Sequence, residues 1–207
     1  SGGGGDDLIY GNKGADRLVG GTGADTLFGG QQSDAVFGLA GADQVYGNKQ
    51  NDTLHGGLGD DSLFGGQNDD VLYGQVGNDR VDGNRGDDTL YGEDGVDTFV
   101  ISKGDDWVMD FAVTEDKIET ADAYAAITQT LAGGNLVLTD SDGDTVTLLG
   151  VTTTLGEGYF VCPLRRPPER LRPLKTAVQA TAKTAGRMPR IMTTLTPKQV
   201  PPPAIEA

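Results

Sequence analysis

The stretch GGTGADTLFGGQQSDAVFG, residues 20–38, decides the fold of this chain because it contains a nine-residue unit twice. Each unit begins with glycine and carries an aspartate at its sixth position, Asp25 in the first and Asp34 in the second. An aliphatic residue, Leu27 or Val36, follows each aspartate two positions later. A short unit repeated in tandem is typical of a stack of small identical elements.

The unit continues in both directions and fills residues 2–100 with eleven copies and no insertion. Position one is glycine and position eight is apolar in every copy. Residues 20–55 also align without a gap on residues 56–91, so four repeats form a larger unit of 36 residues. Position six is aspartate in every copy; these residues are Asp7, Asp16, Asp25, Asp34, Asp43, Asp52, Asp61, Asp70, Asp79, Asp88 and Asp97.

The repeat predicts an all-β fold, a parallel β-roll or β-solenoid. A strand of about three residues with one inward apolar side chain is not stable alone, but copies stacked ~4.8 Å apart pair all their backbone groups. Two repeats then form one coil, and the position-eight side chains meet between two small parallel sheets. We expect glycines at positions one, two and four to supply positive φ angles and close backbone approach.

Six of the residues that replace glycine at positions two and four are singled out, and we expect backbone strain there. They are Gln32, Gln50 and Asn68 at position four, and Leu39, Gln75 and Glu93 at position two.

The aspartates would form two ladders, six from the odd repeats on one edge of the roll and five from the even repeats on the other. Carboxylates ~4.8 Å apart repel each other by roughly 1–3.5 kcal/mol, so we expect a cation between successive rungs. Oxygen ligands without histidine or cysteine favour Ca²⁺. Six rungs leave five spaces and five leave four, which predicts up to about nine ions, with fewer if rungs near Gln32 and Gln50 do not bind.

Charge supports a cationic partner. The net charge of −15 divides into 7 − 29 = −22 for residues 1–162 and 9 − 2 = +7 for residues 163–207. Because residues 1–162 are this acidic, they repel phosphate backbones and anionic lipid. We therefore expect no nucleic-acid partner. No apolar run reaches the ~18 residues of a transmembrane segment, and no signal peptide is visible at the start.

The repeats resemble the hemolysin-type, or repeats-in-toxin (RTX), calcium-binding family, whose motif is G-G-x-G-x-D-x-U-x. The eleven aspartates match the ligand position of that motif. The resemblance implies a right-handed roll that folds only when calcium is present, and a bacterial protein secreted to the extracellular space by type I secretion machinery.

Residues 101–162 predict a small antiparallel β cap that closes the last coil. A strand-turn-strand pattern at 135–149 has DSDG as its turn. Asp140, Asp142 and Asp144 also suggest an EF-hand loop, but Thr145 and Val151 occupy the positions that need glycine and glutamate. A hairpin turn is therefore favoured. DFAVTEDKIE and the apolar YFV at 159–161 are similar to the family's flank and to the endings of type I secretion substrates.

Residues 163–207 contain all nine prolines and no aromatic residue, which predicts a disordered basic tail. Such a tail could contact an anionic surface or the acidic roll, or have no folded role.

Aromatic residues recur at position nine, on the face opposite the core. They indicate either a surface for a glycan or for ice, or stacked rungs that cover the outer sheet; the second interpretation is favoured. His55 shares this position, and we expect it to point outward without a catalytic role.

We expect no catalytic activity within this chain. The motifs H-E-x-x-H, G-x-S-x-G and G-x-x-x-x-G-K are absent from the sequence, and there is one histidine. The first hypothesis is therefore a secreted calcium-binding module. The alternatives are a non-catalytic appendage of a larger extracellular enzyme (a protease, lipase or epimerase) and a cell-surface or matrix adhesin.

Overall fold

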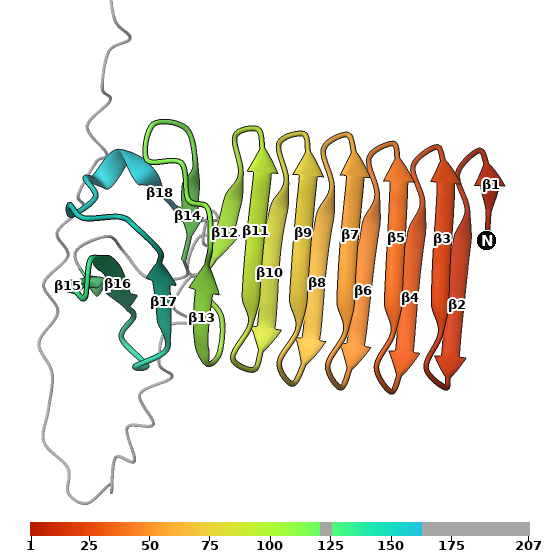
Figure 1. Ribbon diagram of the computed structural model, residues 1–207, viewed down its shortest axis with the longest axis horizontal. Helices are drawn as coiled ribbons and strands as arrows, with labels where there is room; N and C mark the ends of the chain where they lie inside the picture. Colours follow the sequence, from red (N-terminus) through yellow and green to blue (C-terminus); the bar gives the residue numbers. More distant parts are fainter. Residues whose placement is uncertain (121–125, 163–207) are drawn as a thin grey trace, which may run out of the picture. The chain divides into compact units, whose positions relative to one another are not determined.

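A stack of coils fills the repeat region, and each coil consists of two repeats (Figure 1). The computed structural model describes residues 1–120 and 126–162, so the tail predicted for residues 163–207 lies outside the described residues. Paired residues in neighbouring strands are 18 positions apart, as in Leu27 and Val45. This register confirms the predicted coil of two nonapeptides.

The strands of one sheet follow the aspartates of the odd repeats. In spatial order they are β18 (Phe160–Val161), β14 (Lys117–Glu119), β12 (Thr98–Val100), β10 (Arg80–Arg85), β8 (Ser62–Gln67), β6 (Gln44–Lys49), β4 (Thr26–Gln31) and β2 (Leu8–Lys13). All its strand pairs are parallel.

The second sheet has ten strands and begins in the same way. Its order is β1 (Gly3–Gly4), β3 (Arg17–Thr22), β5 (Ala35–Ala40), β7 (Thr53–Leu58), β9 (Val71–Val76), β11 (Thr89–Asp94), β13 (Asp105–Val108), β17 (Thr145–Leu148), β16 (Asn135–Thr139) and β15 (Thr128–Ala132). The all-β parallel roll predicted from the repeat is confirmed.

The strands are longer than the three residues expected. β4 covers positions seven to nine of one repeat and positions one to three of the next. Its pairing with β6 includes Phe28 with Tyr46, passes over the position-one glycine Gly29, and resumes at Gly30 with Asn48. Positions one to three of neighbouring coils are thus also in register, so their backbone groups have partners in the next coil. Only positions four to six remain as the turn.

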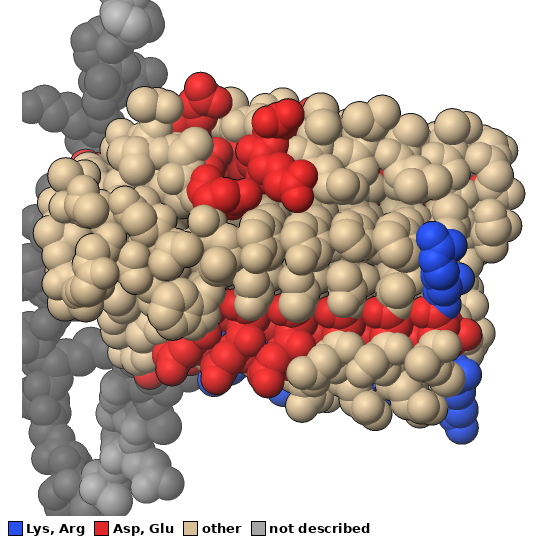
Figure 2. Space-filling view, viewed as in Figure 1, with Lys and Arg blue, Asp and Glu red and all other residues tan. Residues whose placement is uncertain are grey.

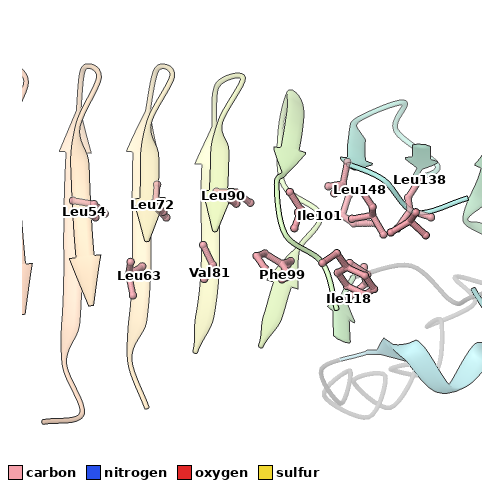
Figure 3. Packing of buried hydrophobic residues seen from close by; sticks show 14 of the residues in the cluster. Leu54, Leu63, Leu72, Val81, Leu90, Phe99, Ile101, Ile118, Leu138 and Leu148 are labelled. Atoms are coloured by element: carbon pink, nitrogen blue, oxygen red, sulfur yellow. The ribbon is translucent and has the colours of Figure 1, made fainter. Parts of the chain in front are cut away.

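Position-eight side chains form the core between the two sheets. Leu54, Leu63 and Leu72 are fully buried, and they alternate between the sheets along the stack (Figure 3). Burial of one such side chain stabilises a fold by about 1.5–3 kcal/mol. The same column continues from Phe99 in the last repeat to Ile118 beyond the repeats, so the cap shares one core with the roll.

Positions two and four have positive φ angles, as predicted. The non-glycine residues among them include Leu39 at 87°, Gln50 at 68° and Asn48 at 83°. The six residues singled out in the sequence all adopt this left-handed conformation. Position one differs from the expectation, because no glycine at that position, from Gly2 to Gly92, has a positive φ. Its glycine is required by space, as the geometry of the aspartates shows.

The cap contains the predicted antiparallel hairpin, in which β16 pairs with β17. Parallel stacking also extends into it, because β13 continues from β11 and β17 continues from β13. In the hairpin turn, the Oδ1 atom of Asp140 accepts backbone hydrogen bonds from Asp142, Gly143 and Asp144. The Asp140 carboxylate therefore organises a turn at the place where the sequence also suggests an EF-hand loop.

Position nine forms stacked rows on the outer faces of both sheets. Tyr10, Phe28, Tyr46 and Phe64 form one row, with ring centroids 4.7–5.0 Å apart. In the other, His55 lies between Phe37 and Tyr73 at 4.8 Å from each, and burial lowers the pKa of its imidazole. The interpretation of these residues as stacked rungs is confirmed.

Candidate metal centres

Each aspartate of the repeats lies where a turn enters a strand, and its backbone N–H points to the aspartate of the next coil. The N–H of Asp34 donates to Oδ1 of Asp52 at 2.7 Å, and the N–H of Asp52 donates to Oδ1 of Asp70 at 2.7 Å. Equivalent bonds of 2.7–2.8 Å join the six odd-repeat aspartates. The structure thus brings the eleven residues together as the two expected ladders.

One edge of the roll carries acidic residues along its length. In Figure 2, acidic residues form a red stripe along the stack, at the edge where β3, β5, β7, β9 and β11 begin. Asp16, Asp34, Asp52, Asp70 and Asp88 immediately precede these strands. The acidic side chains are therefore arranged as a continuous line parallel to the stack.

The second carboxylate oxygen, Oδ2, is buried and unpaired in all eleven aspartates. It lies next to a position-one glycine. A Cβ added to Gly29 would be 2.6 Å from Oδ2 of Asp34 and 2.9 Å from the carbonyl oxygen of Gly47, the equivalent glycine one coil further on. Any larger residue at position one would thus fill a space bordered by a carboxylate oxygen and a backbone carbonyl.

Burial is the largest electrostatic effect on these carboxyl groups. It raises the pKa of Asp70 to about 8, and those of Asp52 and Asp61 to about 7. Repulsion from neighbouring aspartates also raises these pKa values but is a smaller cause, and the backbone hydrogen bond to Oδ1 lowers them. Mutual repulsion, the cost expected from the sequence, is therefore the smaller of the two costs, and burial is the larger.

The ladders extend by one rung each beyond the repeats. Asp106 accepts the N–H of Asp88 at 3.1 Å, and Asp116 accepts the N–H of Asp97 at 3.0 Å. Sequence reasoning missed both residues. The spacing contained a signal for Asp106, which follows Asp88 by 18 positions, whereas Asp116 follows Asp97 by 19 and is out of period.

These last rungs differ from the others in having a protein donor for Oδ2. The hydroxyl of Ser102 donates to Oδ2 of Asp106 at 2.9 Å, and the N–H of Ala112 donates to Oδ2 of Asp116 at 2.7 Å. The terminal carboxylates are thus satisfied within the chain, while the eleven carboxylates of the repeats lack a described donor for one oxygen each.

The donor set fits a hard divalent cation. A buried, unpaired carboxylate oxygen is strongly unfavourable unless a positive group compensates it. Among the described residues, no three acidic, histidine or cysteine side chains converge. A cation between coils would therefore need backbone carbonyls, such as those of the position-one glycines, beside the carboxylates. Carboxylate and carbonyl oxygens in flexible numbers are the ligands that Ca²⁺ takes.

A parallel roll of nonapeptides with rows of buried, unpaired carboxylates belongs to the class of ion-binding repeat solenoids. The family described as RTX calcium-binding nonapeptide repeat (4 copies) matches residues 1–36, 37–72, 46–81 and 73–108. These segments cover more than half of the 207 residues, and the chain belongs to this family. No curated protein matches the chain.

Solved structures with similarity to the chain include a crystal structure of the extracellular lipase LipA from Serratia marcescens. Its identity is 18%, with coverage of 76% of this chain and 38% of the lipase, and a TM-score of 0.33. The solution structure of the AlgE6R2 subunit from the Azotobacter vinelandii mannuronan C5-epimerase is 24% identical, with coverage of 64% and 91% and a TM-score of 0.37. The AlgE6R3 subunit of the same enzyme is 19% identical, with coverage of 94% of both chains and a TM-score of 0.28.

Within residues 1–120 and 126–162, no helix combines the length and apolar character needed to span a membrane.

Proposed function

We propose that this chain is a calcium-dependent folding module of a secreted bacterial protein, and that the eleven position-six aspartates are its ligands. The observation that carries the proposal is the set of eleven buried Oδ2 atoms without a donor. In this proposal residues 1–100 bind the ions, residues 101–162 cap the roll, and the chain contributes binding and folding without catalysis.

The chain itself would hold each ion between coils. The Oδ1 atoms and backbone N–H groups set the ladder register, and the position-one glycines leave room for an ion beside Oδ2. Bound calcium supplies the positive charge that offsets carboxylate burial. Five spaces in one ladder and four in the other give about nine ions, whose +18 nearly balances the −22 of residues 1–162.

Binding and folding are then one process, because the site exists only when coils are stacked. At low cytosolic calcium the charged ladders would disfavour the roll. Extracellular calcium modules bind with a Kd of ~10⁻⁴–10⁻³ M, so bound calcium would favour the roll outside the cell. Folding outside the cell would hinder return of an exported chain through type I secretion machinery.

Far-ultraviolet circular dichroism of the chain at pH 7.5, with EGTA and then with millimolar calcium, tests the proposal. We expect a disordered spectrum in EGTA and a β spectrum in calcium, with calorimetry giving about nine ions. Magnesium is the control, because its preference for octahedral geometry and bound water fits shared carbonyls poorly. An identical β spectrum in EGTA and calcium would refute the proposal.

A further inference from the structure

The outer face of the eight-stranded sheet has two hollows, of about 350 Å³ and 330 Å³, that lie along the stack. The second is lined by Tyr10, Asn12, Phe28, Gly30, Gln31, Asn48 and Lys49. Adding 36 to each number gives residues that all line the first hollow, from Tyr46 through Asn84 to Arg85. The four-repeat unit has therefore built one surface feature twice.

The two hollows are adjacent, because Asn48 lines both of them, and we refer to them together as the groove. Their chemistry is kept between the copies: tyrosine, phenylalanine, asparagine and glutamine recur, and Lys49 is replaced by Arg85. Calcium ligation does not require these side chains, since they point away from the aspartate ladders and the core. The groove is thus a feature that the proposed calcium sites leave unexplained.

A row of basic and amide residues runs along the groove at position three of the even repeats. Register pairs join Lys13 to Gln31, Gln31 to Lys49, Gln67 to Arg85, and Arg85 to Lys103. Its basic members are four of the seven lysine and arginine residues before residue 163. All four are exposed, and none forms an ion pair with a described carboxylate.

From Lys13 to Arg85, charge alternates with amide along this row, and Lys103 adds a second charge beside Arg85. Lys13, Lys49 and Arg85 are 36 residues apart, which is two coils, or ~9.6 Å at the strand spacing. This interval is close to the length of a disaccharide. It does not match a nucleic acid, in which each strand carries a charge every ~3.4 Å in the duplex.

The aromatic row also argues for a saccharide over a nucleic acid. The rings of Phe28 and Tyr46 are stacked with an interplanar angle of 10°, and those of Tyr46 and Phe64 with an angle of 7°. Their faces are covered by each other, so edges and the tyrosine hydroxyls border the groove. Single-stranded nucleic acids need open aromatic faces on which bases stack.

We propose that this groove binds a linear polysaccharide that carries a carboxylate on alternate sugars. The basic side chains of the row bind the carboxylates, and the glutamine and asparagine amides with the tyrosine hydroxyls bind sugar hydroxyls between them. The inference goes beyond calcium binding and requires the roll to be folded. The other sheet has no such row, because its position-three residues are Thr22, Ala40, Leu58, Val76 and Asp94.

The test uses fluorescence anisotropy of a labelled hyaluronan decasaccharide with the whole chain in millimolar calcium. Hyaluronan carries its carboxylate on alternate sugars. The variant K49Q/R85Q removes the two central charges of the groove, and R17Q/K117Q removes two charges from outside it. We expect ~10-fold weaker binding for the first and less than about twofold change for the second.

Circular dichroism of each variant in calcium separates loss of the groove from loss of the fold, and hence this inference from the proposed function. Wild-type chain that folds in calcium but does not bind hyaluronan overturns the inference, as does equal weakening by both double variants. Equal binding of a neutral maltodextrin, or tighter binding of poly-dT, also overturns it.

Discussion

The interior of each aspartate ladder and its last rung use the same residue in the same register, yet they are completed differently. Asp70 and Asp106 both accept a backbone N–H through Oδ1, from the coil before them. At Asp106 a hydroxyl from Ser102 satisfies Oδ2, whereas Oδ2 of Asp70 has no described donor. The cap therefore supplies the hydrogen-bond donor that the repeats lack.

The repeat therefore does not satisfy the hydrogen-bonding needs of its own aspartate. Every repeat presents one oxygen that its own sequence does not satisfy, and an array of eleven such oxygens multiplies the deficit. A dependence on an external cation follows from the repetition, while the cap ends that dependence by introducing donors.

The largest expected effect is the pH dependence of stability in the absence of calcium. Burial raises the pKa of Asp61 to about 7 and that of Asp70 to about 8, against ~3.9 in an unfolded chain. A carboxyl group with a raised pKa stabilises the fold when it is protonated. This stability is fully present below pH ~4 and is lost as the pH rises through about 6–8, the range of the raised pKa values from Asp79 to Asp70.

We therefore expect the chain in EDTA to show β structure by circular dichroism at pH 4 and to lose it between pH 6 and 8. With saturating calcium the direction reverses, because ligand carboxylates must be ionised. A calcium-free β spectrum that strengthens on raising the pH from 4 to 8 would contradict this account.

The second effect comes from mutating one interior aspartate and one terminal aspartate. Asp70→Asn should lower the free energy of unfolding in calcium by about 3 kcal/mol, because a buried ion loses a charged partner. In EDTA the same change should raise the pH at which the β spectrum is lost, because it removes a buried group that otherwise ionises. Asp106→Asn is the matched control and should leave the number of bound ions measured by calorimetry unchanged.

Urea unfolding and calcium titration in calcium, and circular dichroism against pH in EDTA, measure this sign reversal in both variants. If Asp106→Asn lowers the ion count as much as Asp70→Asn, the terminal rungs are also metal sites and the distinction between interior and end is wrong.

A smaller effect concerns the space beside the carboxylates. A Cβ on Gly65 would lie 2.7 Å from the carbonyl oxygen of Gly83 and against Oδ2 of Asp70, while one on Gly158 in the cap would meet open space. We expect Gly65→Ala to destabilise the calcium-bound roll by about 1–3 kcal/mol. Gly158→Ala should have little effect on the thermal unfolding midpoint, and similar losses in both would show that position one is not constrained by space.

The smallest effect concerns positive φ angles in the turns. Leu39 has a φ of 87°, so Leu39→Gly should stabilise the calcium-bound chain by about 1 kcal/mol, because glycine adopts this conformation without strain. Asn48→Gly, at a φ of 83°, should stabilise less because asparagine tolerates the region better. Denaturant midpoints would measure both, and a loss of stability in Leu39→Gly would contradict the strain argument.

Much of the fold followed from the repeat alone. The period of nine, the apolar position eight and the aspartate at position six require neighbours at a constant offset, and the register of Leu27 with Val45 has that offset. The positive φ angles at Gln32 and Leu39 were also expected, because equivalent positions in a regular stack adopt equivalent conformations. Periodicity makes such features predictable, since one coil constrains all the others.

Features that break the nine-residue period could not be predicted from the sequence. Asp116 continues a ladder although it is one residue out of step, because the preceding loop at Ala112 bends the chain so that its carboxylate reaches the same place. The basic row was also not identified, because its members come from alternate repeats and only the pairing of β2, β4, β6, β8 and β10 places them on one face.

By itself the sequence determined that the chain stacks into two-repeat coils with acid at each turn, since a strict period allows one register for its apolar and charged positions. Only the tertiary structure decided which oxygen of each aspartate is satisfied, why position one must be glycine, and where the ladders end. Those properties depend on distances between atoms in neighbouring coils, such as Oδ2 of Asp34 and the carbonyl of Gly47, which no spacing along the chain specifies.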